Sequence, residues 1–443
     1  MRRGWARAGA LGMALLAAAA PPLRAGSAAP DSAAPESAAP QCLAVPAGDA
    51  LRQLVAAAEP GSAFCLADGV HEGPLHIAAA LSLRGGAAAV VRSAGAGSTI
   101  EVNADGVRLS GFSVDGSGAR FDRLDAALRI RGDDVRVENL RIRGALFGIL
   151  AEQCRGLQLL GNSVRGNPQK VLGLRGDGIR LWEVRGARVE NNRLEDSRDL
   201  VVWYSPGNVF AGNQVRRGRY GTHFMYSHGN RVEANRYVDN VVGIFSMYSR
   251  GLQIRGNLIA RSHGAAGVGI GAKESGGLAI VENWLLDNTV GIYLDNSPFD
   301  PARPNRIARN LLRFGESGVV FHGPSAGNRF FGNRFSDLHL SVSVEGRGTA
   351  RDAEWRGNDF DDYAGYDFDG DGIGDVPYVL RTLEADLAAR APALRFFRGT
   401  PALALAEWIG RVAPIFQPST LLEDPAPAMR LAPPPVPGTP DAG

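Results

Sequence analysis

The chain has 443 residues, of which 45% are hydrophobic and 21% charged, and its formal net charge is only +2. A chain of this length can form one large domain or two ordinary ones. The balanced charge argues against a nucleic-acid partner, because neutralising phosphates requires a dense basic surface. Glycine is abundant, at 57 residues, and short apolar runs between turn residues favour strands over helices.

The first 40 residues have the features of an export signal followed by a linker. Two arginines precede an alanine-rich apolar run that is too short to span a bilayer, and small residues follow it. We predict a signal peptide over residues 1–25 and an Ala/Pro-rich linker over residues 26–40. The protein is therefore expected to be exported, and to be periplasmic if its source is Gram-negative.

A repeat of about 22 residues occupies most of the remaining chain, and each copy contains an asparagine between two apolar positions. A second strand-like run, such as "GTHFMYS" or "GIFSMYS", precedes the asparagine in most copies. Two strand signals at a constant offset indicate stacked coils. We predict an all-β fold, a right-handed parallel β-helix of roughly twelve coils of about 22–26 residues, over about residues 65–365 of a domain at 41–378. The repeat asparagines are Asn162, Asn192, Asn213, Asn235, Asn257, Asn283, Asn310, Asn333 and Asn358.

The three cysteines have different expected roles. Cys42 and Cys65 flank the start of the folded region, and in an oxidising compartment we expect a disulfide between them. Cys154 falls in a column of small residues at a turn of the repeat, which favours a structural thiol.

Strand alternation predicts that His223 and Met225 point away from the core. Met247 comes one repeat after Met225, so it should lie in the adjacent coil, about 4.8 Å away. Thioether and imidazole groups suit Cu(I), and His228 in the following turn could join them. The alternative is that these side chains pack among aromatic neighbours or form a protein-docking surface.

The same predicted outer face carries an unusual group of large aromatic residues. Such a contiguous surface is typical of partner binding, although aromatic side chains can also stack on sugars. These residues are Trp182, Trp203, Tyr204, Tyr226 and Tyr248.

An acidic loop at 367–375 has aspartates at alternate positions around a glycine, as in calcium-binding loops. The position of the usual bidentate acid is occupied by Tyr378, so a metal-free Asp/Gly turn is the alternative. The candidate calcium ligands are Asp367, Asp369, Asp371 and Asp375.

Residues 379–423 contain helix-like pieces broken by proline, with Trp408, Ile409 and Phe416 among their apolar side chains. This extension could cap the solenoid or dock on a membrane protein. The proline-rich residues 424–443 are predicted to be disordered.

Several segments resemble the NosD family: "GRYGTHFMYSHGN", "GIFSMYS", "VGIGAKES" and "WRGNDFDDYAGYDFDGDGIGDVPY". The resemblance covers nearly the whole mature chain. It implies a non-enzymatic periplasmic accessory protein that supports copper-centre assembly of nitrous oxide reductase. The implied partners are an ABC-type membrane permease with its cytoplasmic ATPase, a copper-carrying lipoprotein and the reductase. It also implies transient Cu(I) binding at His223, Met225 and Met247, and a permease contact in the C-terminal extension.

The competing function is a carbohydrate-active β-helix enzyme, namely a polysaccharide lyase, hydrolase or epimerase. Such enzymes need an acid and a base around one sugar ring. Glu183 and Glu274 are the acids nearest the centre of the predicted face, and the repeat separates them by about four coils.

Overall fold

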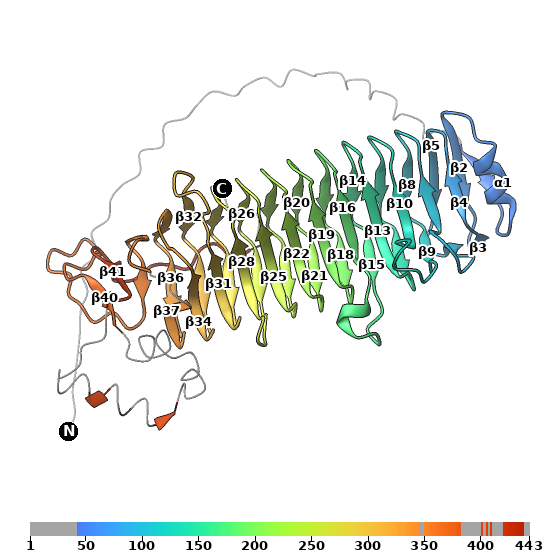
Figure 1. Cartoon of the computed structure of the whole chain (residues 1–443). Helices are drawn as coiled ribbons and strands as arrows, with labels where there is room; N and C mark the ends of the chain where they lie inside the picture. Colours follow the sequence, from blue (N-terminus) through green and yellow to red (C-terminus); the bar gives the residue numbers. More distant parts are fainter. Residues whose placement is uncertain are drawn as a thin grey trace, which may run out of the picture. The chain divides into compact units, whose positions relative to one another are not determined.

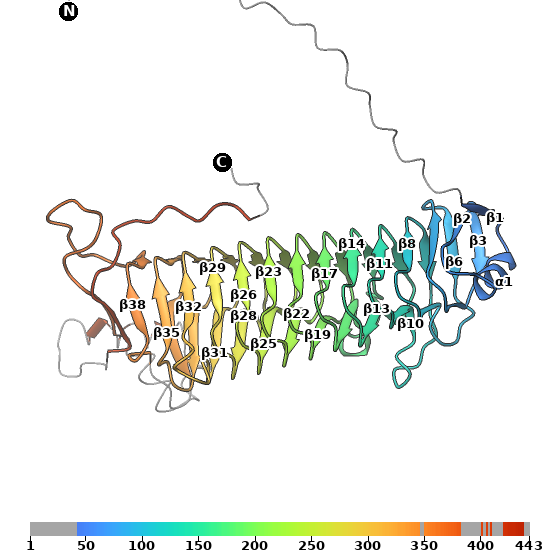
Figure 2. The same ribbon diagram turned by 90° about the horizontal axis from the view of Figure 1, so that it is seen from above.

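The computed structural model describes residues 42–345, 350–381, 400–401, 405, 408–409 and 420–437. The predicted signal peptide and linker lie outside this part of the chain. Within it, successive coils stack into a parallel β-solenoid, and three long parallel sheets run along the stack (Figures 1 and 2). The fold class predicted from the repeat is confirmed.

Each full coil contributes one short strand to each sheet. Sheet A contains β1 (Leu43–Val45), β2 (Ser62–Leu66), β5 (Leu81–Gly85), β8 (Arg108–Ser110), β11 (Arg136–Glu138), β14 (Gln158–Leu160), β17 (Arg188–Glu190), β20 (Val209–Ala211), β23 (Arg231–Glu233), β26 (Gln253–Arg255), β29 (Ala279–Val281), β32 (Asn305–Ala308), β35 (Asn328–Phe331) and β38 (Glu354–Arg356). Sheet B contains β3 (Gly69–Glu72), β6 (Ala89–Arg92), β9 (Ser113–Asp115), β12 (Arg141–Arg143), β15 (Ser163–Arg165), β18 (Arg193–Glu195), β21 (Gln214–Arg216), β24 (Arg236–Val238), β27 (Leu258–Ala260), β30 (Trp284–Leu286), β33 (Leu311–Arg313), β36 (Arg334–Ser336) and β39 (Asp359–Phe360). Sheet C contains β4 (Leu75–Ile77), β7 (Ile100–Val102), β10 (Ala126–Ile130), β13 (Phe147–Glu152), β16 (Ile179–Trp182), β19 (Asp199–Trp203), β22 (Tyr220–Met225), β25 (Val242–Met247), β28 (Val268–Lys273), β31 (Val290–Asp295), β34 (Ser317–His322) and β37 (Leu340–Glu345).

The solenoid is longer than the sequence predicts. Sheet A has 14 described strands and begins at Leu43, whereas the repeat pattern predicted roughly twelve coils from about residue 65. The first coils lack the repeat asparagine, so they are inconspicuous in the sequence. At this end, helix α1 (Ala50–Ala56) buries Leu51 and Val55, and a disulfide joins Cys42 to Cys65 with Cα atoms 5.5 Å apart.

The interior of the solenoid is a single apolar core lined by inward columns of all three sheets. The repeat asparagines lie buried at the turns between sheets A and B. Asn235 shows the pattern, because its Oδ1 accepts hydrogen bonds from the backbone N and the Nδ2 of Asn213, at 2.8 and 2.9 Å. Its own Nδ2 donates to the carbonyl of Phe210 at 2.8 Å. The asparagines thus satisfy backbone groups that the turns leave unpaired.

The C-terminal end is closed by a separate two-stranded sheet of β40 (Tyr378–Leu380) and β41 (Leu422–Asp424). Asp424 ends the asparagine column, since its carboxylate accepts hydrogen bonds from Asn358 N and Nδ2 at 3.0 and 2.9 Å.

The structure differs from the prediction that residues 424–443 are disordered. Residues 424–437 continue along the solenoid, with Leu431 N donating to Asp359 and Trp284 Nε1 donating to the carbonyl of Pro434. Backbone hydrogen bonding to side chains of distant coils orders this segment, and proline content alone does not reveal it. Residues 438–443 lie outside the described residues.

Candidate functional site

The centre of the candidate site is a histidine–methionine contact on the outer side of sheet C. In the pairing of β22 with β25, His223 lies opposite Phe245 and Met225 opposite Met247. Met247 therefore reaches His223 diagonally, and its Sδ lies 3.2 Å from His223 Nε2. The structure brings these two predicted ligands into contact, and Met225 lies beside them, at the position that pairs with Met247.

His223 points away from the core, as the strand register predicts, but it is only 7% exposed. Aromatic side chains enclose it: Tyr220 stacks on the imidazole with ring centres 4.7 Å apart, and Trp203 meets it edge-on at 5.8 Å. Phe245 lies on a third side at 6.4 Å. The outer face predicted at this position is thus an aromatic pocket around one imidazole.

Burial determines the charge of His223. Desolvation lowers the pKa of the imidazole from 6.5 to about 4, so the ring is neutral at neutral pH. A neutral imidazole has a free nitrogen lone pair, which is the form that binds metals. Its Nδ1 is buried without a hydrogen-bond partner in the described structure. An unsatisfied buried nitrogen costs folding free energy, which fits a group retained for binding.

The donor set suits a soft cation, and a small movement would admit one. Two bonds of about 2.0 and 2.3 Å, the lengths for nitrogen and sulfur ligands of zinc, need about 4.3 Å between donors on opposite sides of the ion. The observed distance of 3.2 Å between His223 Nε2 and Met247 Sδ is too short to hold an ion between these two atoms. Methionine side chains are flexible, so Met247 can move by about 1 Å at low cost.

A buried charge network that the repeat pattern does not predict lies beside this cluster. Asp199 accepts hydrogen bonds from Tyr220 N at 3.0 Å and Arg219 Nε at 3.1 Å. Asp177 accepts one from Arg198 Nε at 3.0 Å, and burial raises its pKa to about 6. The sequence signal was an aspartate at position 199, in a column where neighbouring repeats have glycine. The network holds the start of β22, including the tyrosine that covers the histidine.

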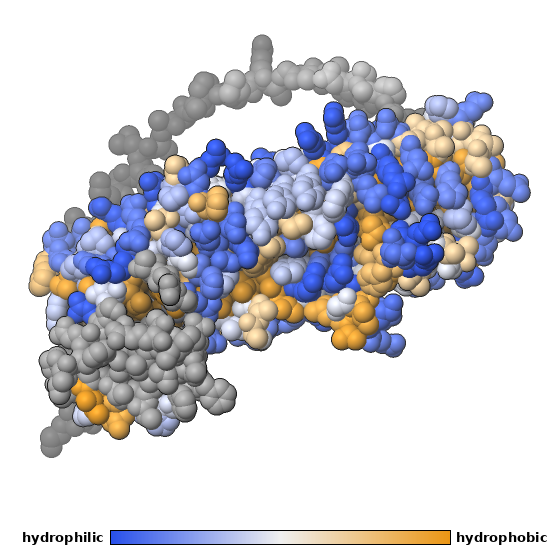
Figure 3. All heavy atoms as spheres, viewed as in Figure 1, coloured by the Kyte–Doolittle hydropathy of each residue, from blue (hydrophilic) through white to orange (hydrophobic). Residues whose placement is uncertain are grey.

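The predicted aromatic face divides into two parts. Trp182 and Trp203 lie on strands β16 and β19 and meet edge-on at 5.8 Å. Tyr204, Tyr226 and Tyr248 lie in the turns that follow β19, β22 and β25, where their rings stack in a row. In the view of Figure 3, hydrophobic residues gather along the lower flank of the middle coils, while the upper flank is mostly hydrophilic.

His228 belongs to the tyrosine row rather than to the histidine–methionine cluster. Its Nδ1 accepts a hydrogen bond from Arg250 N at 3.2 Å, and it lines a groove of about 630 Å³ together with Tyr226 and Tyr248. The described structure gives it no contact with Met247. The prediction that it joins the other three ligands therefore needs a conformational change.

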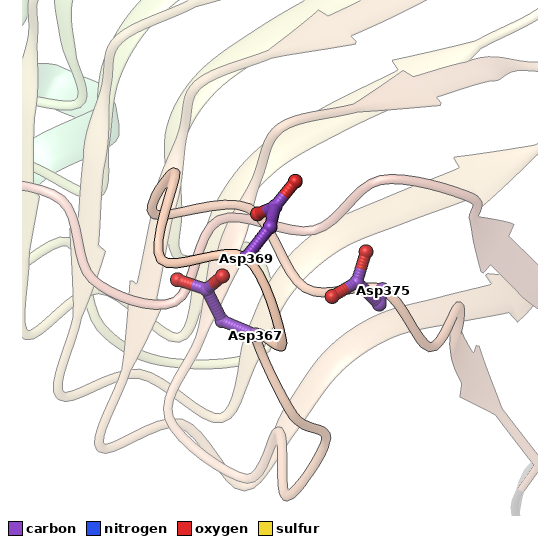
Figure 4. Close-up of side chains that lie close together, drawn as sticks. All are labelled: Asp367, Asp369 and Asp375. Atoms are coloured by element: carbon purple, nitrogen blue, oxygen red, sulfur yellow. The ribbon is translucent and has the colours of Figure 1, made fainter.

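The acidic loop gathers three of its four aspartates (Figure 4). Carboxylate oxygens of Asp367, Asp369 and Asp375 lie within 4.8 Å of one another, a spacing that calcium bonds of about 2.3–2.6 Å can bridge. Asp371 is outside this group and accepts a hydrogen bond from Ile373 N at 2.7 Å. Asp367 also accepts backbone hydrogen bonds from Gly370 and Gly372, so the loop already satisfies part of its charge.

The C-terminal extension is described only in part. Trp408 and Ile409 are exposed, at 60% and 48%, and Phe416 lies outside the described residues. None of the described helices is long and apolar enough to cross a membrane.

Comparisons with known proteins agree with the sequence resemblance. Residues 160–365 match the family model described as "Periplasmic copper-binding protein (NosD)". The chain is 28% identical over 385 residues to a "Probable ABC transporter binding protein NosD" of Stutzerimonas stutzeri, covering 82% of this chain and 86% of the relative. A protein of the same description from Pseudomonas aeruginosa is 29% identical over 405 residues, covering 83% and 88%.

Two solved structures share the fold. The A-module of a mannuronan C-5 epimerase of Azotobacter vinelandii has a TM-score of 0.52 at 13% identity, covering 69% of this chain and 92% of that one. The surface adhesin PfbA of Streptococcus pneumoniae has a TM-score of 0.51 at 12% identity, covering 64% and 86%. At such low sequence identity, the similarity to these two structures shows only that the solenoid fold is shared. The match of residues 160–365 to the family model, together with the two relatives that extend over most of the sequence, makes this chain similar to proteins of the NosD family.

Proposed function

We propose that this chain is a non-enzymatic periplasmic accessory protein that handles copper during assembly of the copper centres of nitrous oxide reductase. The observation that carries the proposal is the contact of 3.2 Å between the buried, neutral imidazole of His223 and the Sδ of Met247. Both residues lie inside the region that matches the copper-binding family model.

The proposed cargo is Cu(I), bound transiently by His223, Met225 and Met247. Thioether sulfur favours Cu(I) over ions that prefer oxygen ligands, and a neutral imidazole supplies the nitrogen. The aromatic enclosure of His223 excludes water from one side of the site. Flexible methionines at the open side suit a site that must both accept and release its ion. His228 is a candidate for an intermediate position on the way in or out.

The proposed partners are an ABC-type permease with its cytoplasmic ATPase, a copper-carrying lipoprotein and the reductase. The names of both relatives, which describe ABC transporter binding proteins, support the first of these. The exposed Trp408 and Ile409 are the proposed permease contact, because exposed large apolar side chains often mark docking sites. Calcium in the loop of Asp367, Asp369 and Asp375 would have a structural role.

The experiment that tests the biological role is deletion of the gene, followed by copper analysis of the purified reductase. We expect reductase that lacks its copper centres, restored by the wild-type gene. The H223A/M225A/M247A variant should accumulate normally in the periplasm without restoring copper. Met429→Leu, a methionine change outside the cluster, is the matched control and should restore it. Full copper loading in the deletion strain would refute the proposal.

The alternative function, a carbohydrate-active enzyme, draws support from the exposed tyrosines beside Glu183 and Glu274. It predicts release or epimerisation of uronic acid residues by the purified protein. Either activity on polyuronate would replace the copper proposal with the enzymatic one.

A further inference from the structure

Three consecutive coils carry tyrosine where the backbone disfavours it. Tyr204, Tyr226 and Tyr248 have φ angles of 53°, 50° and 51°, in the left-handed region. Asparagine and glycine tolerate this region, whereas bulky side chains adopt it rarely. The equivalent turn in a later coil has Asn296, with φ of 45°. The same turn is left-handed at Gln153, Glu183 and Glu274, so the fold sets this backbone, and the feature that needs a reason is the run of three aromatic side chains on it.

The tyrosine rings cover one another's faces. Tyr204 and Tyr226 stack at 5.3 Å with an interplanar angle of 8°, and Tyr226 and Tyr248 stack at 4.9 Å and 15°. Tyr204 and Tyr226 are nevertheless 42% and 43% exposed. Because the faces between neighbouring rings are occupied, the stack offers mainly ring edges and phenol hydroxyls to a ligand. Both faces of Tyr226 are covered, so a sugar ring cannot stack on this central tyrosine.

Basic side chains lie beside the tyrosines, two residues further along the turns, except that the coil of Tyr204 has Pro206 at this position. Desolvation lowers the pKa of His228, so the arginines supply the positive charge. Arg155, Arg185, His228 and Arg250 are exposed there in their respective coils. In the described part of the chain the three arginines have no ion pair, although many arginines elsewhere pair laterally, as Arg261 does with Asp239 at 2.6 Å. These three arginines therefore keep their hydrogen-bond donors available.

The tyrosines and cations line two adjoining hollows. One, of about 630 Å³, contains Tyr226, His228 and Arg250 and is bounded by the exposed Phe299. The other, of about 590 Å³, contains Tyr226 and His228 with Arg185. Together they cross the coils from Gln153 to Arg303. At about 4.8 Å per coil this is roughly 29 Å, the length of about nine extended residues.

We propose that this tyrosine–arginine groove binds an extended acidic segment of a partner protein. Guanidinium groups and phenol hydroxyls both donate hydrogen bonds to carboxylates, and their alignment over successive coils suits a chain that runs along the solenoid axis. Phe299 would contact an apolar side chain of the same segment. The inference rests on the partner-docking part of the proposed function. It does not depend on copper, because the groove and the buried His223 are separate.

Three acidic residues line the hollows, and one of them, Asp300, pairs with Arg303. The other two, Glu183 and Glu274, limit the segment that fits. They stand in the tyrosine column just before and just after the three tyrosines, so acidic residues of the segment should concentrate over the middle coils.

The test uses the mature chain and a fluorescein-labelled ten-residue peptide of alternating glutamate and leucine, followed by fluorescence anisotropy. We expect saturable binding that weakens as salt rises, since exposed charges are screened. R185E/R250E should weaken binding by about tenfold or more. Arg236→Glu, an exposed arginine on β24 in sheet B, is the matched control and should bind the peptide like wild type.

The Y226N/Y248N variant separates binding from folding. Asparagine suits the left-handed backbone, so its thermal midpoint should equal or exceed that of wild type while peptide affinity falls at least about fivefold. A Cu(I) titration of the same variants should give wild-type affinity, which distinguishes failure of the groove from failure of the copper site.

Three results would each overturn the groove proposal. The first is no saturable peptide binding up to about 1 mM. The second is wild-type affinity in R185E/R250E or in Y226N/Y248N. The third is an uronate oligosaccharide that binds the groove while the peptide does not compete, which would assign the groove to saccharides.

Discussion

We expect the imidazole of His223 to stay unprotonated down to an unusually low pH, because it is buried. Desolvation lowers its pKa from 6.5 to about 4 in the folded chain. The unfolded chain, with an ordinary imidazole, takes up a proton at higher pH than the folded chain does. The contribution of His223 to the free energy of unfolding is therefore largest above pH 6.5, and it is lost as the pH falls toward 4.

The size of the effect follows from the two pKa values. At ~1.4 kcal/mol per pH unit, the interval from 6.5 to about 4 corresponds to roughly 3 kcal/mol. Asp177 acts in the opposite direction, since burial raises its pKa from 3.8 to about 6 and its contribution is lost as pH rises through 6. Only the difference between wild type and a His223 variant isolates the histidine.

Two measurements check this prediction. Histidine ¹H–¹⁵N NMR titration, assigned with His223→Gln, should show one imidazole that stays neutral down to about pH 4.5. The difference in unfolding free energy between wild type and His223→Gln should change by ~2.5 kcal/mol between about pH 7.5 and 4.5. His76→Gln, at an exposed histidine, is the control and should leave this pH dependence in place. An imidazole at position 223 that titrates near pH 6.5 would refute the reasoning, because water would then reach the site.

The remaining predictions concern the turns, the C-terminal closure and the acidic loop. Asn235→Ala leaves a buried N–H and a buried carbonyl of the adjacent coil unpaired, so its unfolding free energy should fall by ~2–4 kcal/mol in urea titrations. Asn191→Gly, at an exposed turn with φ of 56°, should change the unfolding free energy by less than about 1 kcal/mol. Equal losses of unfolding free energy in the two variants would contradict a special role for the buried asparagine column. Asp424→Ala should lower the thermal midpoint and expose the last coil to hydrogen exchange, because it removes the carboxylate that ends the asparagine column. Unchanged hydrogen exchange would mean that β41 closes the solenoid without this carboxylate. Addition of Ca²⁺ should raise the thermal midpoint and the D369N/D375N variant should lose that increase, whereas no increase in wild type would leave the loop a metal-free turn.

The sequence predicts the solenoid well because its stacking is periodic. The fixed offset between each asparagine and the preceding strand determines which side chains meet in adjacent coils. It therefore predicts that Met225 lies opposite Met247, as the structure confirms. It missed the start of the solenoid before about residue 65, where the asparagine is missing and the chain carries no comparable marker.

The environment of His223 could be predicted only in part. The strand register gives its direction, but its burial depends on Tyr220, which the hydrogen bonds of Asp199 hold in place. Such contacts depend on rotamers and on a register shift between β19 and β22, which no repeat pattern encodes. His228 shows the same limit, because its turn directs it to the tyrosine groove.

The C-terminal tail was mispredicted for a related reason. Its proline-rich composition is typical of disorder, and its order comes from single hydrogen bonds to residues such as Asp359 and Trp284, far away in sequence. Composition reports on local preferences and carries no signal for these distant contacts.

The central claim, that His223, Met225 and Met247 bind Cu(I), is tested most directly by an anaerobic competition titration of the purified mature chain against a chromophoric Cu(I) chelator. We expect wild type and Met429→Leu to withdraw copper from the chelator with equal affinity. H223A/M225A/M247A should show the same circular dichroism as wild type but withdraw none. Undiminished Cu(I) affinity in the triple variant would show that these three residues do not form the site.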